Sequence, residues 1–264
     1  MPRRLAATVC ALFAALALGA SSASALPAMG VPLDVLLHSA PQLGPASIPS
    51  VVLGPQGARA AGRLPADAGS IVEVRPGAWV PVHASPGGRV IQMLDWRTDS
   101  DSHERAFTVY AVADGRWLGV SVPMLDGHLG WIDADPQRLT VRAAVEMIRV
   151  SLSERALELL YAGRVVMRTP VVIGAPSTPT PPGQFSVDDV VHFDPASPEY
   201  GIGALALSVP PPGRNWVYWR VAIHGLNNLG QLGGTGSLGC VHVPTAQLRE
   251  LLTLPVGTPV DIVG

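Results

Sequence analysis

The sequence predicts a mostly β protein in which a small β-barrel is followed by a second β domain with one or two short helices. Short runs rich in valine, isoleucine and tryptophan, separated by turn signals, occupy residues 71–138, a spacing typical of small all-β barrels. Residues 141–264 carry further alternating strands and one helical pattern. No internal repeat of roughly 20 to 50 residues occurs, which excludes solenoid and propeller architectures.

Residues 1–25 have the three parts of a secretory signal peptide. Arg3 and Arg4 precede the apolar run Leu5–Leu18, and the small residues Ala23-Ser24-Ala25 fit an A-x-A cleavage site. A membrane anchor is the alternative, but the apolar run is shorter than the roughly 20 residues of a spanning helix. We therefore expect cleavage after Ala25 and export, either to the periplasm or to the cell wall and extracellular space.

Export would leave a mildly acidic chain with one cysteine. Cleavage removes Cys10, so Cys240 has no partner for an intramolecular disulfide. It also removes two arginines, which moves the formal charge from −2 to −4 and argues against nucleic acid or anionic membranes as partners. The 18 basic residues are all arginine. The lack of lysine excludes Schiff-base chemistry and phosphate loops ending in Gly-Lys-Ser/Thr.

Two segments precede the C-terminal domain. Residues 26–70 are rich in proline, glycine, alanine and serine and are interpreted as a linker; the alternative is that "VPLDVLLHSA" and "IPSVVLG" pack on a neighbouring domain. Within residues 71–138, the pieces "PVHASPGGRVI", "GRWLGVSVP" and "GHLGWIDAD" resemble the landmarks of a bacterial Src-homology-3-type domain. The resemblance implies a module that often binds cell-wall material in exported enzymes.

The stretch from residue 141 to residue 264 is long enough for one domain. "MIRVSLSERALELLYAGRVVMRTPVVIG" predicts three strands, with "AGR" as the hairpin turn between the second and third. The prolines of "TPTPPGQF" predict a rigid turn, and further strands are expected around "ALALSV", "WVYWRVAIHG" and "TPVDIVG". "PTAQLRELLTL" predicts a helix with Pro244 at its first position and leucines on one face.

Cys240 lies in the glycine-rich stretch "GTGSLGCVH" and is a candidate nucleophile. A cysteine attacks as the thiolate, so it needs a base and donors for the oxyanion it creates. His224 ends the apolar run "VYWRVAI" and is followed by Gly225 and a glycine-rich loop that can present amide groups. Two alternatives are a buried small hydrophobe and a zinc site of Cys240, His224 and His242, which lacks the usual ligand gap and a fourth ligand.

These residues also carry a family resemblance. "IHGLNN", followed by "SLGCVHV", resembles the signature of the L,D-transpeptidase (YkuD-type) catalytic domain, which is usually His-Gly-x-Asn and then Ser-His-Gly-Cys-x-Arg. Upstream, "VVIGAPSTPTPPGQF" resembles the family's Gly-x-x-x-x-x-Thr-Pro-x-Gly-x-Phe stretch, with comparable residues at Gly174, Thr180, Pro181, Gly183 and Phe185. The resemblance implies a β-sandwich over residues 141–264.

It also implies a cysteine acyl transfer on peptidoglycan stem peptides. Cys240 would attack the carbonyl after the third, meso-diamino-acid residue of a tetrapeptide donor and expel the terminal D-alanine. His224 would accept the thiol proton, with the Gly225 carbonyl orienting its ring and the amides of Leu238, Gly239 and Cys240 forming the oxyanion hole. An amine of a second stem, or of a protein to be attached, would resolve the thioester. The resemblance implies no metal or organic cofactor, and carbapenem-type β-lactams as inhibitors.

Two positions depart from the family pattern. Leu238 stands where a histidine is common, and His242 stands where an arginine is common. Leucine keeps its backbone N–H, whereas replacing the arginine removes a permanent charge that could hold a substrate carboxylate. The candidate substrate-binding residues are Ser237, His242, Asn227, Tyr218 and Trp219, with Ser237 equally open to a role as a turn residue.

Three functions follow from these features. The leading hypothesis is an exported L,D-transpeptidase of cell-wall biogenesis that forms 3→3 peptidoglycan cross-links or attaches a protein to peptidoglycan. The same site could instead serve an L,D-carboxypeptidase-type hydrolase that trims tetrapeptide stems with water. The third hypothesis is a non-catalytic wall-binding protein in which the barrel is the working part.

Overall fold

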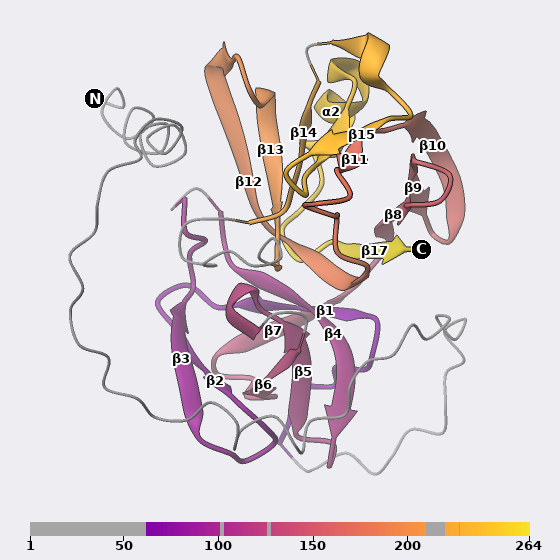
Figure 1. The fold of residues 1–264 in the computed structure, drawn as a ribbon. Coiled ribbons are helices and arrows are strands. Elements are labelled where there is room, and N and C mark those ends of the chain that lie inside the picture. The colour runs from indigo at the N-terminus through magenta and orange to yellow at the C-terminus, as the bar shows by residue number, and fades with distance from the viewer. Residues whose placement is uncertain (1–61, 101–102, 126–127, 210–219, 227) are drawn as a thin grey trace, which may run out of the picture. The chain divides into compact units, whose positions relative to one another are not determined.

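A computed structural model describes residues 62–100, 103–125, 128–209, 220–226 and 228–264, which belong to one compact unit, Pro49–Gly264. The expected signal peptide and most of the expected linker lie outside the described residues. Strands dominate the described chain (Figure 1), so the mostly β fold class is confirmed. Among these residues, no helix is long and apolar enough to cross a membrane.

The first sheet is antiparallel, has the order β3-β2-β6-β5-β4-β1-β7 and surrounds its own core. Alternate residues point inward, as in Val80 and Val82 of β2 or Val72 and Val74 of β1, and meet Phe107 and Leu118. The strands are β1 (Ser70–Val74), β2 (Trp79–His83), β3 (Val90–Asp95), β4 (Ala106–Ala113), β5 (Trp117–Ser121), β6 (Leu129–Asp133) and β7 (Leu139–Ala143). A 3-10 turn, η2 (Pro123–Leu125), lies between β5 and β6.

This module extends beyond the expected limits of residues 71–138. Leu64 and Ala66 pack against its core, and the Leu64 amide donates to the Ala134 carbonyl at 2.9 Å. At the other end, β7 pairs with β1 over residues 139–143. The packed structure therefore begins within the segment interpreted as a linker. The likeness to a Src-homology-3-type domain stays a prediction.

The second module is built on an eight-stranded sheet of order β10-β9-β8-β17-β12-β13-β14-β16, in which β17–β8 and β14–β16 are parallel pairs. A two-stranded sheet, β11-β15, lies beside it. The strands are β8 (Glu146–Ser151), β9 (Ala156–Tyr161), β10 (Arg164–Pro170), β11 (Ile173–Gly174), β12 (Gly183–Ser197), β13 (Gly201–Leu207), β14 (Ala222–Gly225), β15 (Thr235–Ser237), β16 (Val241–Val243) and β17 (Pro259–Val263).

The three strands predicted within residues 147–174 are confirmed as β8, β9 and β10. The hairpin between β9 and β10 turns at Ala162 and Gly163, which have φ values of 47° and 76°, as a two-residue turn between twisted strands requires. The strand around "ALALSV" is present as β13, and that in "TPVDIVG" as β17. Of "WVYWRVAIHG", the described part forms β14.

Strand β12 was not predicted, and its first residues, 183–185, belong to the stretch predicted as a rigid turn. Its sequence "VDDVV" breaks the apolar alternation of a half-buried strand because Asp188 and Asp189 are both buried. The hydrogen bonds of β12 nevertheless continue on both sides, to β17 through its first half and to β13 through its second half. Tertiary pairing therefore overrides the weak local pattern.

The predicted helix is present as α2 (Thr245–Leu251), with one difference at its start. Pro244 is the N-cap, in extended conformation, rather than the first helical residue. Leu248 and Leu251 are fully buried against the main core, which includes Phe185, Leu205 and Ile223. Leu248 also lies under Gly225: a Cβ at that glycine would be 3.4 Å from Leu248 Cδ2 and 3.1 Å from Gly201 Cα. The close approach of these elements thus requires a glycine after His224.

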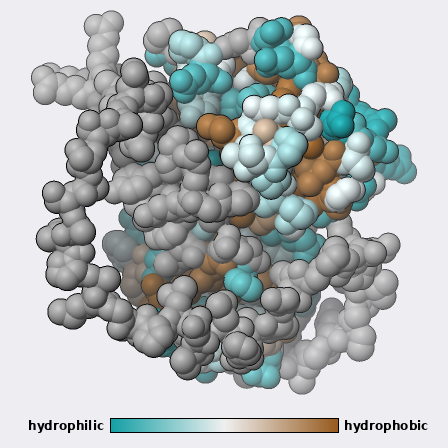
Figure 2. Space-filling view, viewed as in Figure 1, coloured by the Kyte–Doolittle hydropathy of each residue, from teal (hydrophilic) through white to brown (hydrophobic). Residues whose placement is uncertain are grey.

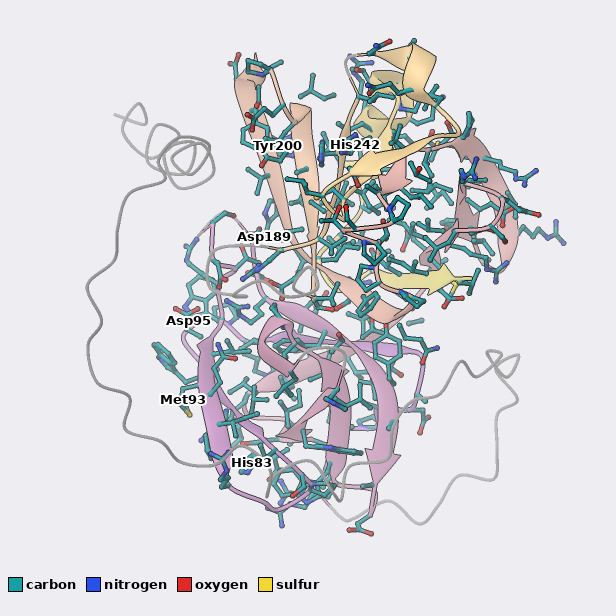
Figure 3. The ribbon with its side chains drawn as sticks, in the orientation of Figure 1. His83, Met93, Asp95, Asp189, Tyr200 and His242 are labelled. Atoms are coloured by element: carbon teal, nitrogen blue, oxygen red, sulfur yellow. The ribbon has the colours of Figure 1, made fainter. Side chains whose placement is uncertain are left out.

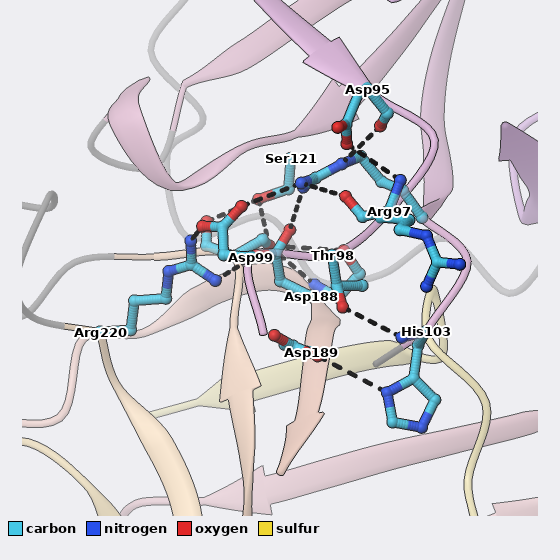
Figure 4. A network of polar contacts seen from close by, with 12 residues as sticks. Asp95, Arg97, Thr98, Asp99, His103, Ser121, Asp188, Asp189 and Arg220 are labelled. Carbon is cyan, nitrogen blue, oxygen red and sulfur yellow. Dashed lines mark hydrogen bonds and ion pairs between the residues drawn. The ribbon is translucent and has the colours of Figure 1, made fainter. Parts of the chain in front are cut away.

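A polar network surrounds the two buried aspartates of β12 (Figure 4). The Asp188 carboxylate accepts from Arg220 Nη1 at 2.5 Å and lies 3.9 Å from Arg105 Nη1. Arg220 and Arg105 both also donate to Asp99. The next residue, Asp189, accepts from the backbone and side chain of Ser100, each at 2.9 Å. The loop between β3 and β4 is therefore tied to the second module by charged hydrogen bonds.

Candidate active site

The register of β14 and β16 brings the predicted nucleophile and base onto one face. His224 is directly opposite His242 in this parallel pair, and Ile223 is opposite Val241. Extending the register by one residue places Cys240 beside Ala222, whose backbone contacts the thiol. Residues two apart on a strand share a face, so Cys240 lies diagonally from His224 on the side where both imidazoles project.

The imidazole ring of His224 contacts two aromatic rings and one backbone carbonyl. His224 is buried, and its ring lies between Tyr200, with a centroid distance of 4.8 Å, and His242, at 4.2 Å. Figure 3 labels Tyr200 and His242, which come from different segments of the second module. His224 Nδ1 is 3.1 Å from the Gly225 carbonyl oxygen, a contact that requires Nδ1 to be protonated and to donate. The neutral ring then presents the lone pair of Nε2, the atom that can act as a base.

The same packing keeps the imidazole rings of His224 and His242 uncharged near neutral pH. Burial, and then the nearby His242, lowers the pKa of His224 from 6.5 to about 3, although the Gly225 carbonyl acts in the opposite direction. Burial also lowers the pKa of His242. Burial raises the pKa of the Cys240 thiol, and the Ala222 backbone only partly offsets this effect. At neutral pH the site therefore holds a thiol and a neutral imidazole rather than a preformed thiolate–imidazolium pair.

A short turn presents Cys240. The buried hydroxyl of Ser237 donates to the Cys240 carbonyl at 2.5 Å and accepts from the Gly239 amide at 3.1 Å. Gly239 has a φ of 112°, which only glycine adopts readily. Ser237 therefore stabilises the turn, because its hydroxyl is hydrogen-bonded to the protein both as donor and as acceptor, and a role in substrate binding stays a prediction.

In this turn, two of the three backbone amides expected to form the oxyanion hole have no acceptor among the described residues and are free to donate to a substrate. The Gly239 amide is engaged by Ser237, so the expectation that it contributes to an oxyanion hole is wrong for this geometry. By contrast, the Leu238 and Cys240 amides donate to no protein group within the described residues. These two N–H groups are therefore the donors that can face a developing oxyanion.

Residues 174–180 stabilise this turn through hydrogen bonds to its backbone carbonyls. The Thr178 hydroxyl donates to the Ser237 carbonyl at 2.9 Å, and the Ala175 amide donates to the same oxygen at 2.9 Å. The hydroxyl of Thr180 is buried and accepts from the Gly174 amide at 2.9 Å while it donates to the Gly239 carbonyl at 3.0 Å. The rigid turn predicted from "TPTPPGQF" thus contacts the segment that carries the nucleophile.

Three of the predicted substrate-binding residues lie outside the described part of the chain. Tyr218, Trp219 and Asn227 are outside the described residues. Leu229, which follows β14, and Leu238, which follows β15, have side chains that are 59% and 57% exposed. Figure 2 shows apolar and polar residues interspersed on the described surface. The described residues contain no group of three or more His, Cys, Asp and Glu side chains that could hold a metal ion.

Sequence reasoning missed Tyr200 and the contact roles of Thr178 and Thr180. Tyr200 follows β12 and packs on His224, and its carbonyl accepts the Gly225 amide at 2.9 Å. Nothing in the local sequence marks this tyrosine. Thr180 had a signal in the threonine-proline stretch, but only the fold shows that its hydroxyl reaches Gly239.

Comparison with known proteins shows similarity to one family over residues 146–262. Residues 146–262 match the L,D-transpeptidase catalytic domain (YkuD) family. YkuD of Bacillus licheniformis, assigned as an L,D-transpeptidase, is 34% identical over 116 residues, which cover 44% of this chain and 64% of the relative. YkuD of Bacillus subtilis is 32% identical over the same shares of both chains. This chain thus covers less than two thirds of either relative, and the similarity is confined to its C-terminal domain.

Some solved structures of L,D-transpeptidases are also similar to this chain. A mutant of the Enterococcus faecium L,D-transpeptidase is 23% identical, with a TM-score of 0.37 over 46% of this chain and 54% of that chain. The catalytic domain of the E. faecium enzyme acylated by ertapenem is 25% identical, with a TM-score of 0.34 over 46% and 98% of the two chains.

Proposed function

We propose that this protein is an exported cysteine L,D-transpeptidase that joins peptidoglycan stem peptides through a thioester on Cys240. The observation that carries the proposal is the shared face of β14 and β16, where Cys240 and His224 lie diagonally opposite and His224 Nδ1 contacts the Gly225 carbonyl. This arrangement supplies a nucleophile and an oriented base, as acyl transfer by cysteine requires.

In the acylation step, His224 Nε2 takes the thiol proton as Cys240 Sγ attacks the carbonyl of the third residue of a donor tetrapeptide. The negative charge that develops on the carbonyl oxygen is stabilised by the amides of Leu238 and Cys240. The C–N bond to the terminal D-alanine then breaks, and the imidazolium returns the proton to the departing amine. The products are a thioester and free D-alanine.

In the second step, the amine of an acceptor stem attacks the thioester carbonyl. Neutral His224 accepts the proton that the amine loses, and the C–S bond breaks as the thiolate leaves and is reprotonated. An amine on a diamino acid gives a 3→3 cross-link, an amine on a protein gives attachment to peptidoglycan, and water gives a trimmed tripeptide.

The substitution of His242 for an arginine shapes substrate binding in this proposal. The ring packs against His224, and burial lowers its pKa, so His242 offers a neutral hydrogen-bonding group near neutral pH. A substrate carboxylate would therefore be held more weakly than by arginine. Strained β-lactam carbonyls of the carbapenem class are expected to acylate Cys240 by the same first step.

Export is part of the proposal because peptidoglycan stems lie outside the cytoplasmic membrane. It is supported by the arginines, the short apolar run and the A-x-A site of residues 1–25. N-terminal sequencing of the secreted protein should begin at Leu26. Retention of Met1 on a membrane-bound product would contradict it.

The activity is tested with a purified chain that starts at Leu26. A tetrapeptide donor is supplied with and without a diamino-acid acceptor, and the products are identified by mass spectrometry. Cross-linked dimer that forms only with acceptor supports the transpeptidase, whereas tripeptide alone in both reactions identifies a hydrolase. If Cys240→Ala gives the same products as the unmodified chain, or if neither forms any product while both bind peptidoglycan, the proposal is wrong.

A further inference from the structure

The peptide group that joins Gly239 to Cys240 is held by one buried hydroxyl. Thr180 Oγ1 is 3.0 Å from the Gly239 carbonyl oxygen and 2.9 Å from the Gly174 amide nitrogen. The Gly174 amide can only donate, so the hydroxyl accepts from it. The hydroxyl hydrogen is then available for the Gly239 carbonyl, and the direction of this second bond is fixed by the first.

This contact determines where the Cys240 amide points. In a trans peptide, the C=O of one residue and the N–H of the next point in opposite directions. Because the Gly239 carbonyl points to Thr180, the Cys240 N–H points away from it, toward the side on which no described protein group accepts it. The following peptide is fixed separately, by the bond from Ser237 to the Cys240 carbonyl.

The conformation at Gly239 makes such a restraint necessary. Glycine at a φ of 112° has no Cβ to limit rotation of the flanking peptides. Without an acceptor or donor on its carbonyl, the peptide between Gly239 and Cys240 could rotate and carry the amide away from the oxyanion position. Thr180 is only 3% exposed, so water does not readily replace its hydroxyl.

We infer that Thr180 is a positioning residue for acyl transfer, which orients the Cys240 amide as an oxyanion donor through the Gly239 carbonyl. The inference rests on the proposed function, since it assigns how one group of that site is prepared for the reaction. Thr180 contacts neither the thiol nor the imidazole in the described structure, and it acts through the backbone alone.

The test separates carbonyl chemistry from thiol reactivity. Thr180→Val keeps the shape of the side chain and removes the hydroxyl, whereas Thr180→Ser keeps the hydroxyl. Two reagents are used on each variant: a carbapenem, whose attack creates an oxyanion, and iodoacetamide, whose displacement at carbon creates none. Both rates of modification at Cys240 are followed by intact-protein mass spectrometry.

In Thr180→Val, acylation by the carbapenem should be slower by about 10-fold to 100-fold, since losing one oxyanion donor costs roughly that much or more. Alkylation by iodoacetamide should stay within about twofold, because thiol access and pKa are unchanged. Thr180→Ser should acylate at nearly the rate of the unmodified protein. Equal acylation in the valine variant, a parallel loss of both reactions, or an equal loss in the serine variant would overturn the inference.

Two further results remain informative. If Thr180→Val does not fold, Thr180→Ala is compared with Thr180→Ser by the same criteria. If the unmodified protein is alkylated but never acylated, the proposed function fails. The positioning role is then judged by the amide signal of Cys240 in ¹H–¹⁵N spectra. This signal should shift in the valine variant and return in the serine variant, and an unshifted signal would overturn the role.

Discussion

The imidazole rings of His224 and His242 lie on adjacent parallel strands with their centroids 4.2 Å apart. Two imidazolium ions at this separation would repel each other, and burial of the pair adds a desolvation cost. Burial lowers the pKa of both histidines, and the nearby His242 lowers the pKa of His224 further. The imidazole of His224 is therefore unprotonated, with its Nε2 lone pair free, at neutral and mildly acidic pH.

The pH dependence of catalysis should reflect this neutral pair. With the pKa of His224 lowered to about 3, protonation of the base should not reduce kcat/KM between pH 7.5 and about pH 5. Alkylation of Cys240 by iodoacetamide should instead rise with pH through a pKa above the ordinary thiol value, because burial raises that pKa. Rate profiles of the two reactions check this. A fall of kcat/KM centred near pH 6.5 would contradict the assignment.

Loss of either reacting side chain should abolish turnover while the fold is kept. Cys240→Ala removes the nucleophile and His224→Ala removes its base, and residues that act as a unit each cost several orders of magnitude in rate. Circular dichroism should show unchanged strand content in both variants. Cys240→Ser should also be nearly inactive, because a hydroxyl is a weaker nucleophile with the same base. Normal turnover in any of the three would refute their roles.

Folding stability should depend on pH through His224. Its pKa is about 3 in the folded state and 6.5 in the unfolded state, so between these values the unfolded chain binds more protons. The contribution of His224 to the free energy of unfolding is therefore complete above pH 6.5 and is lost as the pH falls toward 3. From pH 6.5 to 4.5 the loss from this residue is about 2 kcal/mol.

Urea unfolding of His224→Gln at several pH values measures this contribution. Between pH 6.5 and 4.5, the free energy of unfolding of the variant should fall by about 2 kcal/mol less than that of the unmodified protein. His242 is unchanged in both proteins, so its own titration cancels in the comparison to first order. Parallel stability curves would mean that His224 is not buried as a neutral group.

The network around Asp188 should contribute more to stability than a surface ion pair. Arg220→Gln leaves the Asp188 carboxylate, which is 2% exposed, with Arg105 at 3.9 Å as its remaining cation. Breaking a buried pair in this way costs about 3 kcal/mol of unfolding free energy. Arg168→Gln is the matched control, because the Arg168–Glu154 pair is more than half exposed and should change stability by less than about 1 kcal/mol. Equal effects of the two substitutions in urea unfolding would contradict the argument.

The sequence predicts the elements whose local pattern agrees with their final environment. The run from Met147 to Pro170 alternates in polarity and contains its own turn at Ala162 and Gly163, so three strands follow from it directly. The leucines of α2 have helical spacing. The local sequence does not predict strand β12, because it contains the buried residues Asp188 and Asp189. Their partners in ion pairs and hydrogen bonds, Arg220 and Ser100, are distant in the sequence.

The candidate active site likewise contains residues that a local pattern predicts and contacts that it does not. Cys240, His224 and Gly225 are recognisable because their spacing resembles a family signature, and the register of β14 and β16 brings the first two to one face. The packing of Tyr200 on His224 and the bond from Thr180 to Gly239 join segments separated by more than 20 residues. A linear pattern contains no information on such contacts, and the commitment of the Gly239 amide to Ser237 is likewise visible only in the folded turn.

Isolation of the acylated enzyme would establish whether Cys240 forms a thioester with a peptidoglycan stem. The chain starting at Leu26 is incubated with tetrapeptide donor and no amine acceptor, quenched in acid, digested and mapped by mass spectrometry. We expect a Cys240 peptide heavier by the acyl tripeptide, with D-alanine released in equal amount, and no adduct in His224→Ala. An unmodified Cys240 alongside released D-alanine, or an adduct on another residue, would contradict it.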